Sequence, residues 1–252
     1  MLVLDRKQEI MKLLRKRKSI RVTELSELFY TCQSTIRRDL TDLEKTGFLK
    51  RTYGGAVLLE GMEAEAPFLA RETDKTNTKS HIGKLAAKLV HEGDVIAMDA
   101  STTTLFMIPY LAHLKEFTVI TSGAKMAMDL ANTTQARIIS TGGQMRTRSL
   151  TYTGEIAIRT VELFHYDTVF FSCNSITMED GLYDVILDEI ALCHAMLVRA
   201  KRKVLLLDDS KFDRRGFCKL CDFAQINYLI TNQQPSPKWV EYLRENRVRL
   251  LY

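Results

Sequence analysis

The chain lacks any long apolar run. In its 252 residues no hydrophobic stretch approaches the about 18 residues that a membrane-spanning helix requires. The N-terminus also lacks the apolar core of a signal peptide. We therefore expect a cytoplasmic protein with no membrane partner.

Cysteine is scarce and scattered, with five residues in the whole chain. An odd number at irregular spacing does not describe a disulfide framework. Cys218 and Cys221 have the spacing of a zinc or redox pair, but zinc needs two further ligands and no matching pair follows. We expect reduced thiols, with no metal and no cofactor.

Positive charge is confined to one end of an otherwise ordinary composition. Hydrophobic residues make up 46% and charged residues 27%, which is typical of a soluble globular protein of one or two domains. Residues 1–58 hold 13 Lys and Arg against 7 Asp and Glu, whereas the remainder holds 23 against 24. A basic patch on one small domain indicates nucleic-acid binding, because each neutralised phosphate releases counterions. Charge alone leaves open a solvated basic face on an ordinary helical hairpin.

The segment around Ile36 has the pattern of a helix with one buried face. Ile36, Leu40 and Leu43 recur at i, i+4 and i+7, so they share one side. Thr23 is a good N-cap for the preceding helix, and the turn at 30–32 joins the two. Two short helices joined by a tight turn predict a helix-turn-helix, whose second helix enters the major groove of DNA.

The flanking segments complete this domain. We call this second helix, which carries Ile36 and Leu40, the reading helix, and we expect Gly47 to end it. Residues 48–57 are expected to form a hairpin, or wing, around a glycine turn. An upstream helix at about 5–17 would bury Ile10, Met11, Leu13 and Leu14. Arginine can donate two hydrogen bonds to a guanine edge, while hydroxyls and further cations hold phosphates. The residues that we expect to contact double-stranded DNA are Gln33, Ser34, Thr35, Arg37, Arg38, Thr41, Lys50 and Arg51.

Beyond a linker predicted at 59–78, which has no clear period, helical and strand patterns alternate. Apolar strands are expected at 95–98, 117–121, 137–141, 168–172, 204–208 and 228–231. Helices are expected at 79–91, 103–114, 124–130, 155–163, 189–200 and 237–246. This alternation predicts an α/β domain whose parallel sheet is covered on both faces.

Polar residues follow four of the predicted strands. Ligands of parallel sheets bind at the carboxyl ends of the strands, so these residues form a candidate site. Hydroxyls and amides at the start of the helix after Asp99 suit a phosphate. Taken singly, each motif has a plainer interpretation as an N-cap, a turn or a surface ion pair. The candidates are Asp99, Ser101, Thr102, Thr103, Ser122, Gly142, Gly143, Asp208 and Lys211.

On these motifs the chain resembles the DeoR family of bacterial transcription regulators. The N-terminal resemblance rests on Arg6, Thr35-Ile36-Arg37-Arg38-Asp39-Leu40, Leu43-Glu44, Gly47, Arg51 and Gly54-Gly55. The C-terminal resemblance rests on Lys79, Ile82, Asp99, Thr102-Thr103, Gly142-Gly143, Gly154, Gly181, Glu189, Asp208 and Ser210-Lys211-Phe212. It implies a winged helix-turn-helix domain at 1–58 and an effector domain at 79–252, related in fold to ribose-5-phosphate isomerase and glucosamine-6-phosphate deaminase. It also implies a phosphorylated sugar as ligand, and adds Glu189 to the candidate site.

Four positions depart from the family pattern. Cys32 stands where a capping Ser is usual, and Cys is a poor cap, so Thr31, Ser34 or water would have to satisfy the helix amides. In the effector domain Ser101 replaces Gly, Ser122 replaces Asn and Cys193 replaces Lys. Losing that lysine removes a cation that could meet an anionic ligand.

Three functions follow from these features. The first is a DNA-binding repressor of carbohydrate-metabolism genes, a homodimer or homotetramer whose DNA affinity a phosphorylated sugar controls. The second is a ligand-independent regulator whose effector pocket has decayed. The third is a sugar-phosphate isomerase or deaminase using Asp99, Glu189, Asp208 and Lys211. No histidine lies in the strand-end motifs and a basic domain gives an enzyme no benefit, so we expect no catalytic residues and no enzyme.

Overall fold

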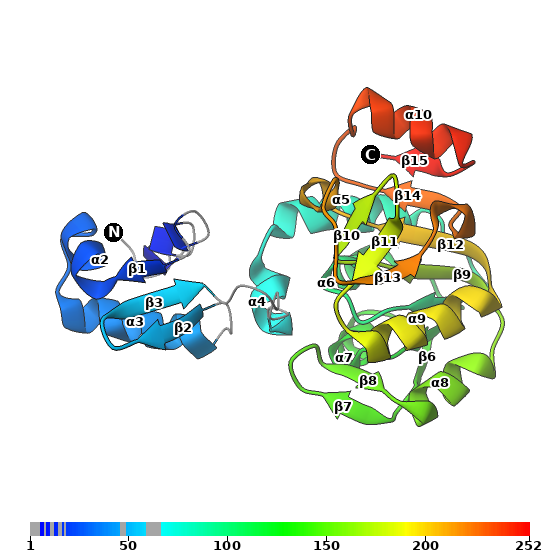
Figure 1. Cartoon of the computed structure of the whole chain (residues 1–252). Coiled ribbons are helices and arrows are strands. Elements are labelled where there is room, and N and C mark those ends of the chain that lie inside the picture. Colours follow the sequence, from blue (N-terminus) through cyan, green and yellow to red (C-terminus); the bar gives the residue numbers. More distant parts are fainter. Residues whose placement is uncertain are drawn as a thin grey trace. The chain divides into compact units, whose positions relative to one another are not determined.

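The computed structural model describes residues 6–58, except 8, 11, 12, 15, 16, 18 and 46–48, and residues 67–252. The chain divides into two units, Met1–Arg71 and Glu72–Tyr252, and each is described by itself (Figure 1). No helix in the described ranges combines the length and apolarity needed to cross a bilayer.

The N-terminal unit is a helix-turn-helix with a wing. Its elements are β1 (Ser19–Arg21), α2 (Val22–Leu28), α3 (Gln33–Lys45), β2 (Leu49–Thr52) and β3 (Gly55–Leu58), and residues 6, 7, 9, 10, 13, 14 and 17 are also helical. The strands form an antiparallel sheet of order β1-β3-β2. Ile10, Leu14, Leu25, Ile36 and Leu40 lie at the centre of the core. The predicted helices and hairpin are thus confirmed, while Met11 and Gly47 lie outside the described residues.

Two local details of this unit differ from expectation. Thr23 is not the cap, because α2 begins at Val22 and Arg21 occupies the N-cap without a side-chain hydrogen bond. Strand β1 is too short to show an alternating pattern, and pairing with β3 forms it. Gly55 permits this pairing, since a Cβ there would lie 2.1 Å from the Ile20 carbonyl oxygen.

The predicted linker is helical in its described part. Of residues 59–78 the structure describes 67–78, which contain α4 (Phe68–Thr73) and the start of α5 (Thr76–Ala87). The linker at 59–78 therefore stays a prediction, and its described part is helical. Helix α4 and the first turn of α5 were not predicted, because regular apolar spacing begins only with Ile82 and Ala86, two buried residues of α5.

A seven-stranded parallel sheet forms the centre of the second unit. Its order is β15-β14-β12-β9-β4-β5-β6, and every neighbouring pair is parallel. The strands are β4 (Val95–Met98), β5 (Thr118–Thr121), β6 (Arg137–Ser140), β9 (Tyr166–Phe171), β12 (Ala200–Leu206), β14 (Tyr228–Ile230) and β15 (Arg249–Leu251). The predicted parallel α/β architecture is thus confirmed, with β15 as an additional edge strand.

The remaining helices pack around this sheet (Figure 1). They are α6 (Thr102–Leu105), α7 (Ala124–Thr133), α8 (Glu155–Glu162), α9 (Leu187–Arg199) and α10 (Pro237–Glu245), with 3-10 turns η1 (Ile108–Tyr110), η2 (Asp209–Lys211) and η3 (Phe223–Gln225). The prediction of one helix at 103–114 is wrong, because α6 has four residues and η1 follows it. Pro109 lacks the N–H that a continuing helix needs.

Two small antiparallel sheets were not predicted, because their strands have only three or four residues. One is the hairpin of β7 (Gln144–Arg146) and β8 (Thr151–Thr153), and the other joins β10 (Ser175–Thr177), β11 (Gly181–Asp184) and β13 (Cys218–Cys221). Strand β13 carries a bulge, since Lys219 and Cys221 pair with the adjacent residues Tyr183 and Leu182. Cys218 is half-buried and Cys221 is buried. Burial raises the pKa of Cys221 to about 12.

The chain reverses its direction across the large sheet between β4 and β9. After β4, strands β5 and β6 extend to one side, and the chain then returns to β9 on the other side and continues through β12 and β14 to β15. In open parallel sheets, ligands bind beyond the carboxyl ends of the strands at such a reversal. The residues after β4 and β9 therefore mark the candidate ligand site.

Candidate functional site

Helix α3 presents its polar side chains opposite its buried face. Ile36 and Leu40 are fully buried and α3 packs against α2. The predicted DNA contacts on this helix are all exposed or half-buried, namely Gln33, Ser34, Thr35, Arg37, Arg38 and Thr41. The Thr41 hydroxyl donates to the Arg37 carbonyl oxygen at 2.8 Å, so it is already hydrogen-bonded within the helix. Arg37 and Arg38 are thus left as the long donors on the solvent side.

Cys32 lies directly before α3, in the capping position. Its Sγ is 3.2 Å from Ser34 Oγ and 3.1 Å from Thr35 Oγ1. Hydrogen bonds from these two hydroxyls and from the Thr35 amide lower the pKa of Cys32 to about 7. Thr31 takes no part, because its hydroxyl donates to the Phe29 carbonyl oxygen. The thiolate form of Cys32 thus accepts hydrogen bonds where a serine oxygen would.

Asp39 is buried in the middle of the reading helix and forms an ion pair that the sequence did not reveal. Arg6 Nε donates to Asp39 Oδ2 at 2.6 Å, and the two side chains are 9% and 3% exposed. This hydrogen bond raises the pKa of Arg6 above its ordinary value. The pair fastens the first helical segment to α3. Its sequence signal was a carboxylate on the apolar side, between Ile36 and Leu40.

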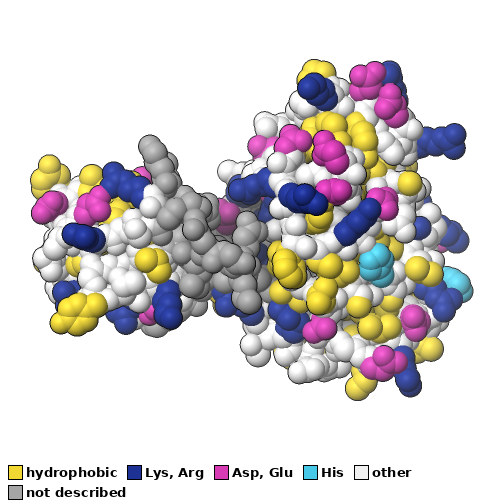
Figure 2. Space-filling view, viewed as in Figure 1, with side chains coloured by type: hydrophobic (Ala, Val, Ile, Leu, Met, Phe, Trp, Pro, Cys, Tyr) yellow, Lys and Arg dark blue, Asp and Glu magenta, His cyan; other side chains and the backbone are white. Residues whose placement is uncertain are grey.

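The wing is fastened to the end of α3. Both the backbone N–H and the Nε of Arg51 donate to the Glu44 carboxylate, each at 2.9 Å, and these bonds lower the pKa of Glu44. Lys50 is exposed on the same strand, and Tyr53 is fully exposed at the tip. The eight predicted contacts therefore come from α3 and the wing that α3 holds. Figure 2 shows Lys and Arg side chains over the visible face of this unit.

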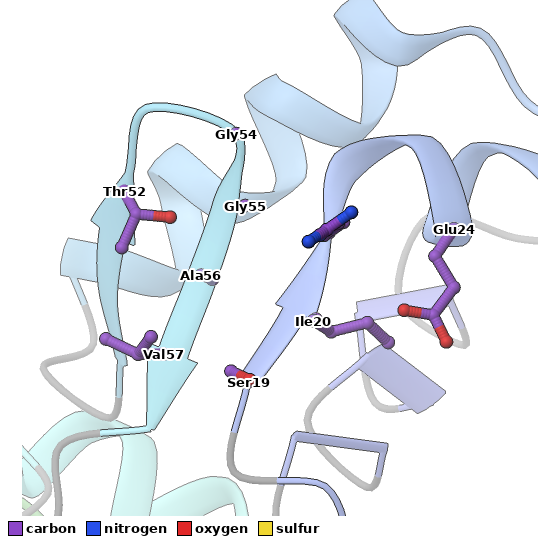
Figure 3. Close-up of a pocket in the computed structure, with 9 residues that line it drawn as sticks. Ser19, Ile20, Glu24, Thr52, Gly54, Gly55, Ala56 and Val57 are labelled. Atoms are coloured by element: carbon purple, nitrogen blue, oxygen red, sulfur yellow. The ribbon is translucent and has the colours of Figure 1, made fainter.

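A hollow of about 420 Å³ lies beside the wing, over one face of the small sheet (Figure 3). It is lined by β1, by Glu24 of α2, by Thr52 of β2 and by residues 54–57 of the turn and β3. Among the described residues, its lining shares none with the predicted DNA-contacting set.

Asp99 anchors the site at the carboxyl edge of the large sheet. Its Oδ2 accepts the Ser172 N–H at 2.8 Å, which joins the ends of β4 and β9 at the reversal. Its Oδ1 accepts the Thr104 hydroxyl at 2.6 Å and the Ser101 N–H at 3.0 Å. Burial raises the pKa of Asp99, and these hydrogen bonds oppose that effect. The carboxylate is thus positioned where ligands of such sheets bind.

The loop after Asp99 is built differently from the expected anion site. Ser101 caps α6 by accepting the Thr104 N–H at 3.2 Å. Thr102 and Thr103 are 4% and 8% exposed, so their side chains are largely withdrawn from solvent. Because α6 has only four residues, its dipole is much weaker than that of the predicted helix. Thr104, which the sequence did not single out, provides the side-chain contact to Asp99.

The ends of β5 and β6 carry the remaining predicted loops, and the β5 loop lies against the residue after Asp99. Gly123 packs against Ala100, since a Cβ on Gly123 would lie 3.2 Å from the Ala100 Cα. Its neighbour Ser122 is buried. Gly142 and Gly143 have φ values of +62° and +111°, which L side chains rarely adopt. A Cβ on Gly143 would also lie 2.6 Å from the Thr153 carbonyl oxygen.

The β7–β8 hairpin brings Glu189 to this edge. Tyr152 N–H donates to the Ser122 carbonyl oxygen at 2.8 Å, so the hairpin lies against the end of β5. Glu189, in the first turn of α9, accepts the Ser149 hydroxyl at 2.7 Å and Arg146 Nε at 3.1 Å. The sequence did not identify Arg146 or Ser149, because the hairpin itself was not predicted. Arg146 supplies a cation to the site.

Asp208 and Lys211 follow β12, which lies two strands from β4. With neighbouring strands about 4.8 Å apart, the ends of β12 and β4 are separated by roughly 10 Å, the span of a small metabolite. Asp208 accepts Ser210 Oγ and Lys75 Nζ, both at 2.5 Å. Although burial alone would raise it, these bonds hold the pKa of Asp208 below its ordinary value. Lys211 is half-buried on the same turn.

Comparison with known proteins bears on both units. Residues 6–61 match the DeoR-like helix-turn-helix domain, and residues 74–233 match the DeoR C terminal sensor domain. YulB of Bacillus subtilis strain 168, an uncharacterized HTH-type transcriptional regulator, is 37% identical over 99% of this chain and 96% of its own. The lactose phosphotransferase system repressor of Streptococcus mutans serotype c is 32% identical over 93% of this chain and 94% of its own. Ribose 5-phosphate isomerase A of Methanocaldococcus jannaschii covers 55% of each chain with a TM-score of 0.42 and 16% identity, a likeness too weak to support a conclusion.

Proposed function

The chain belongs to the DeoR family of transcriptional regulators, and from this membership we propose that it represses carbohydrate-metabolism genes and is released from DNA by a phosphorylated sugar. It is a DNA-binding regulator and not an enzyme, as the sequence predicted. It would act in the cytoplasm, as a homodimer or homotetramer, because helix-turn-helix proteins commonly read two half-sites. Light scattering of the purified protein at micromolar concentration measures that state.

On the DNA side, we assign base reading to the exposed face of α3. Arg37 and Arg38 have the length and donor geometry to reach guanine edges. Gln33, Ser34 and Thr35 lie at the start of the helix, where the first turn meets the groove floor or its walls. Lys50 and Arg51 would hold phosphates, with Glu44 orienting Arg51. Thr41 would contact a phosphate only by giving up its bond to Arg37.

On the ligand side, the sheet edge combines carboxylates with cations. Asp99, Asp208 and Glu189 can accept hydrogen bonds from sugar hydroxyls, while Lys211 and Arg146 can meet a phosphate. The observation that carries the proposal is the position of Asp99 at the sheet reversal, bonded to both β9 and α6. A relative named for a lactose phosphotransferase system supports a carbohydrate ligand.

The departures at Ser101, Ser122 and Cys193 bear on how this ligand is held. Ser101 serves as the cap of α6, and Ser122 is buried while its backbone binds the hairpin. Burial raises the pKa of Cys193, so this position carries a neutral thiol where the family usually has a lysine. The phosphate would then depend on Arg146 and Lys211, together with Ser101 and the backbone N–H groups of Thr102, Thr103, Gly142 and Gly143.

A thermal-shift screen tests the ligand. We would use D-ribose 5-phosphate, D-fructose 1-phosphate and D-galactose 6-phosphate, with the free sugars and inorganic phosphate as controls. A ligand with a dissociation constant of about 10 μM, present at about 1 mM, stabilises the folded state by about 2.7 kcal/mol. For a unit of this size the melting temperature rises by about 5 to 10 °C. The same compound should then release the protein from operator DNA in a fluorescence anisotropy titration.

The ligand-independent regulator remains the alternative. It is favoured by the loss of the lysine at Cys193, and it predicts that none of the sugar phosphates stabilises the protein at millimolar concentration. Under that outcome DNA binding would persist unchanged in their presence. An Asp99→Asn variant separates the two cases further, because it should abolish a genuine ligand shift and leave DNA affinity without ligand unaltered.

A further inference from the structure

We call the second unit, Glu72–Tyr252, the sensor unit, and its first residues form ion pairs with the candidate ligand site at two points. We call residues 72–79 the connecting segment. It runs from the second half of α4 into the first turn of α5. Glu72 Oε1 lies 3.3 Å from Lys125 Nζ, and Lys75 Nζ lies 2.5 Å from Asp208 Oδ1. Inside the segment, Lys79 Nζ donates to the Asp74 carbonyl oxygen at 2.8 Å.

Both partners of the connecting segment belong to strand-end loops of the site. Lys125 is the second residue of α7, directly after the Ser122–Gly123 loop that ends β5. Lys125 Nζ also forms an ion pair with Asp129 of the same helix at 2.8 Å, which further holds the Lys125 side chain in position. Asp208 ends β12 and caps the turn that carries Lys211. A change at either loop therefore reaches the connecting segment through one ion pair.

The contact between Lys75 and Asp208 is the one that an anion can break. Lys75 is the N-cap of α5 and has a φ of +51°, a conformation that is unfavourable for a lysine. Its side chain is 36% exposed, whereas that of Asp208 is 8% exposed. Besides Asp208, its Nζ contacts Ser210 Oγ at 2.5 Å. The lysine is thus the accessible partner, and its contacts help to hold a strained backbone in place.

A phosphate at this sheet edge would attract Lys75 and repel Asp208. At short range in partly buried surroundings, the attraction of a phosphate for Lys75 is comparable with that of the Asp208 carboxylate. Lys211 also lies near Asp208, but it is on the same turn and its movement would not displace the connecting segment. Lys75 is the cation that links Asp208 to the connecting segment.

We propose that Lys75 and Asp208 form an ion-pair latch, which a bound sugar phosphate opens so that the connecting segment moves and DNA affinity falls. This proposal rests on the proposed function, since it takes the sugar phosphate as the ligand. The anion displaces the Asp208 carboxylate from Lys75, and the positive φ at Lys75 relaxes when its side chain leaves. The α4–α5 junction then changes its course, and α4 spans the boundary between the two units at Arg71 and Glu72.

The test compares Lys75→Met, which keeps the stem and removes the charge, with Lys84→Met on the exposed side of α5 as the matched control. The full-length protein is titrated against the DNA that the wild type selects from a random pool, with and without D-fructose 1-phosphate, D-ribose 5-phosphate and D-galactose 6-phosphate. Without any sugar phosphate, Lys75→Met should bind this DNA at least tenfold more weakly than the wild type. Addition of the sugar phosphate that releases the wild type should change its affinity by less than twofold. Lys84→Met should behave as the wild type does.

Two further variants separate the latch from simple loss of folding. Asp208→Asn should lower DNA affinity as Lys75→Met does, and Lys75→Arg, which keeps the charge, should restore the wild-type ratio of affinities with and without sugar phosphate. The latch is overturned if Lys75→Met binds DNA as tightly as the wild type without sugar phosphate, or if it responds to the sugar phosphate in full. If no sugar phosphate shifts the wild-type melting temperature, the proposed ligand is wrong, and the comparison made without sugar phosphate still decides the latch.

Discussion

Removing the Asp39 carboxylate should strongly destabilise the DNA-binding unit while leaving the sensor unit intact. Asp39 and Arg6 are 3% and 9% exposed and meet at 2.6 Å, so Asp39→Ala leaves a guanidinium buried without its partner. Loss of one member of such a pair costs about 3 to 5 kcal/mol. A domain of about 60 residues has a total stability of roughly 3 to 9 kcal/mol. The substitution therefore removes most of its stability and lowers its melting temperature by about 12 °C or more.

Two optical signals separate the units in this experiment. Trp239 is the single tryptophan and is buried in the sensor unit, so its fluorescence follows that unit alone. Circular dichroism follows both. Asp39→Ala should shift an early circular dichroism transition downward, leave the Trp239 transition in place and abolish DNA binding at 37 °C. The double variant Arg6→Met with Asp39→Leu should recover most of the lost stability, because an apolar pair leaves no buried charge. An unchanged early transition in Asp39→Ala would refute this reasoning about the pair.

Four other outcomes are expected. Arg37→Ala should cost about 1 to 3 kcal/mol of specific DNA binding and relax the preference at one base pair. Lys50→Ala should weaken binding to all sequences alike and lower by about 1 the slope of log affinity against log salt concentration. Equal effects of Arg37→Ala on specific and random DNA would contradict base reading. Iodoacetamide should modify Cys32 first, because Cys173 and Cys193 are buried and their pKa values are raised. The rate should rise with pH around a midpoint near 7, which is the pKa of Cys32. Mass spectrometry locates the adduct, and Cys32→Ser is the control. Since folding lowers the pKa of Cys32, its contribution to stability is present above the unfolded-state pKa and is lost as pH falls through about 7. Gly143→Ala should destabilise the sensor unit by about 1 to 3 kcal/mol in urea unfolding followed by Trp239 fluorescence. Gly142→Ala should destabilise it less, because a Cβ at 142 meets nothing within 4 Å. The reverse order would contradict a clash between residue 143 and the Thr153 carbonyl oxygen.

Periodicity predicted the reading helix well because a helix with one buried face repeats every three to four residues. Ile36, Leu40 and Leu43 all lie in the core, and the polar residues between them face outward. Asp39 was the exception, a carboxylate on the buried side. Nothing local identifies its partner, since Arg6 lies 33 residues earlier in the chain.

In the sensor unit, the pattern of apolar strands and helices predicted the parallel sheet. It failed at short elements such as the β7–β8 hairpin, because three residues carry no measurable period. It also failed at 103–114, where Pro109 interrupts the helix that the apolar spacing suggested.

The residues of the candidate ligand site also divide into those that the sequence could identify and those that it could not. Asp99, Ser101, Ser122 and Asp208 could be selected because they directly follow strands, and parallel strands end at one edge. Arg146, Ser149 and Lys75 could not, because each reaches the site from a segment distant in the sequence.

The sequence by itself determined the family, the presence of two units and the exposed polar face of α3 that we expect to meet DNA, because local spacing and charge encode these features. Only the tertiary structure decided which charges are paired. Ion pairs such as Arg6–Asp39 and Lys75–Asp208 join residues 33 and 133 positions apart. They depend on how the chain folds back on itself, and local residue patterns carry no record of such contacts.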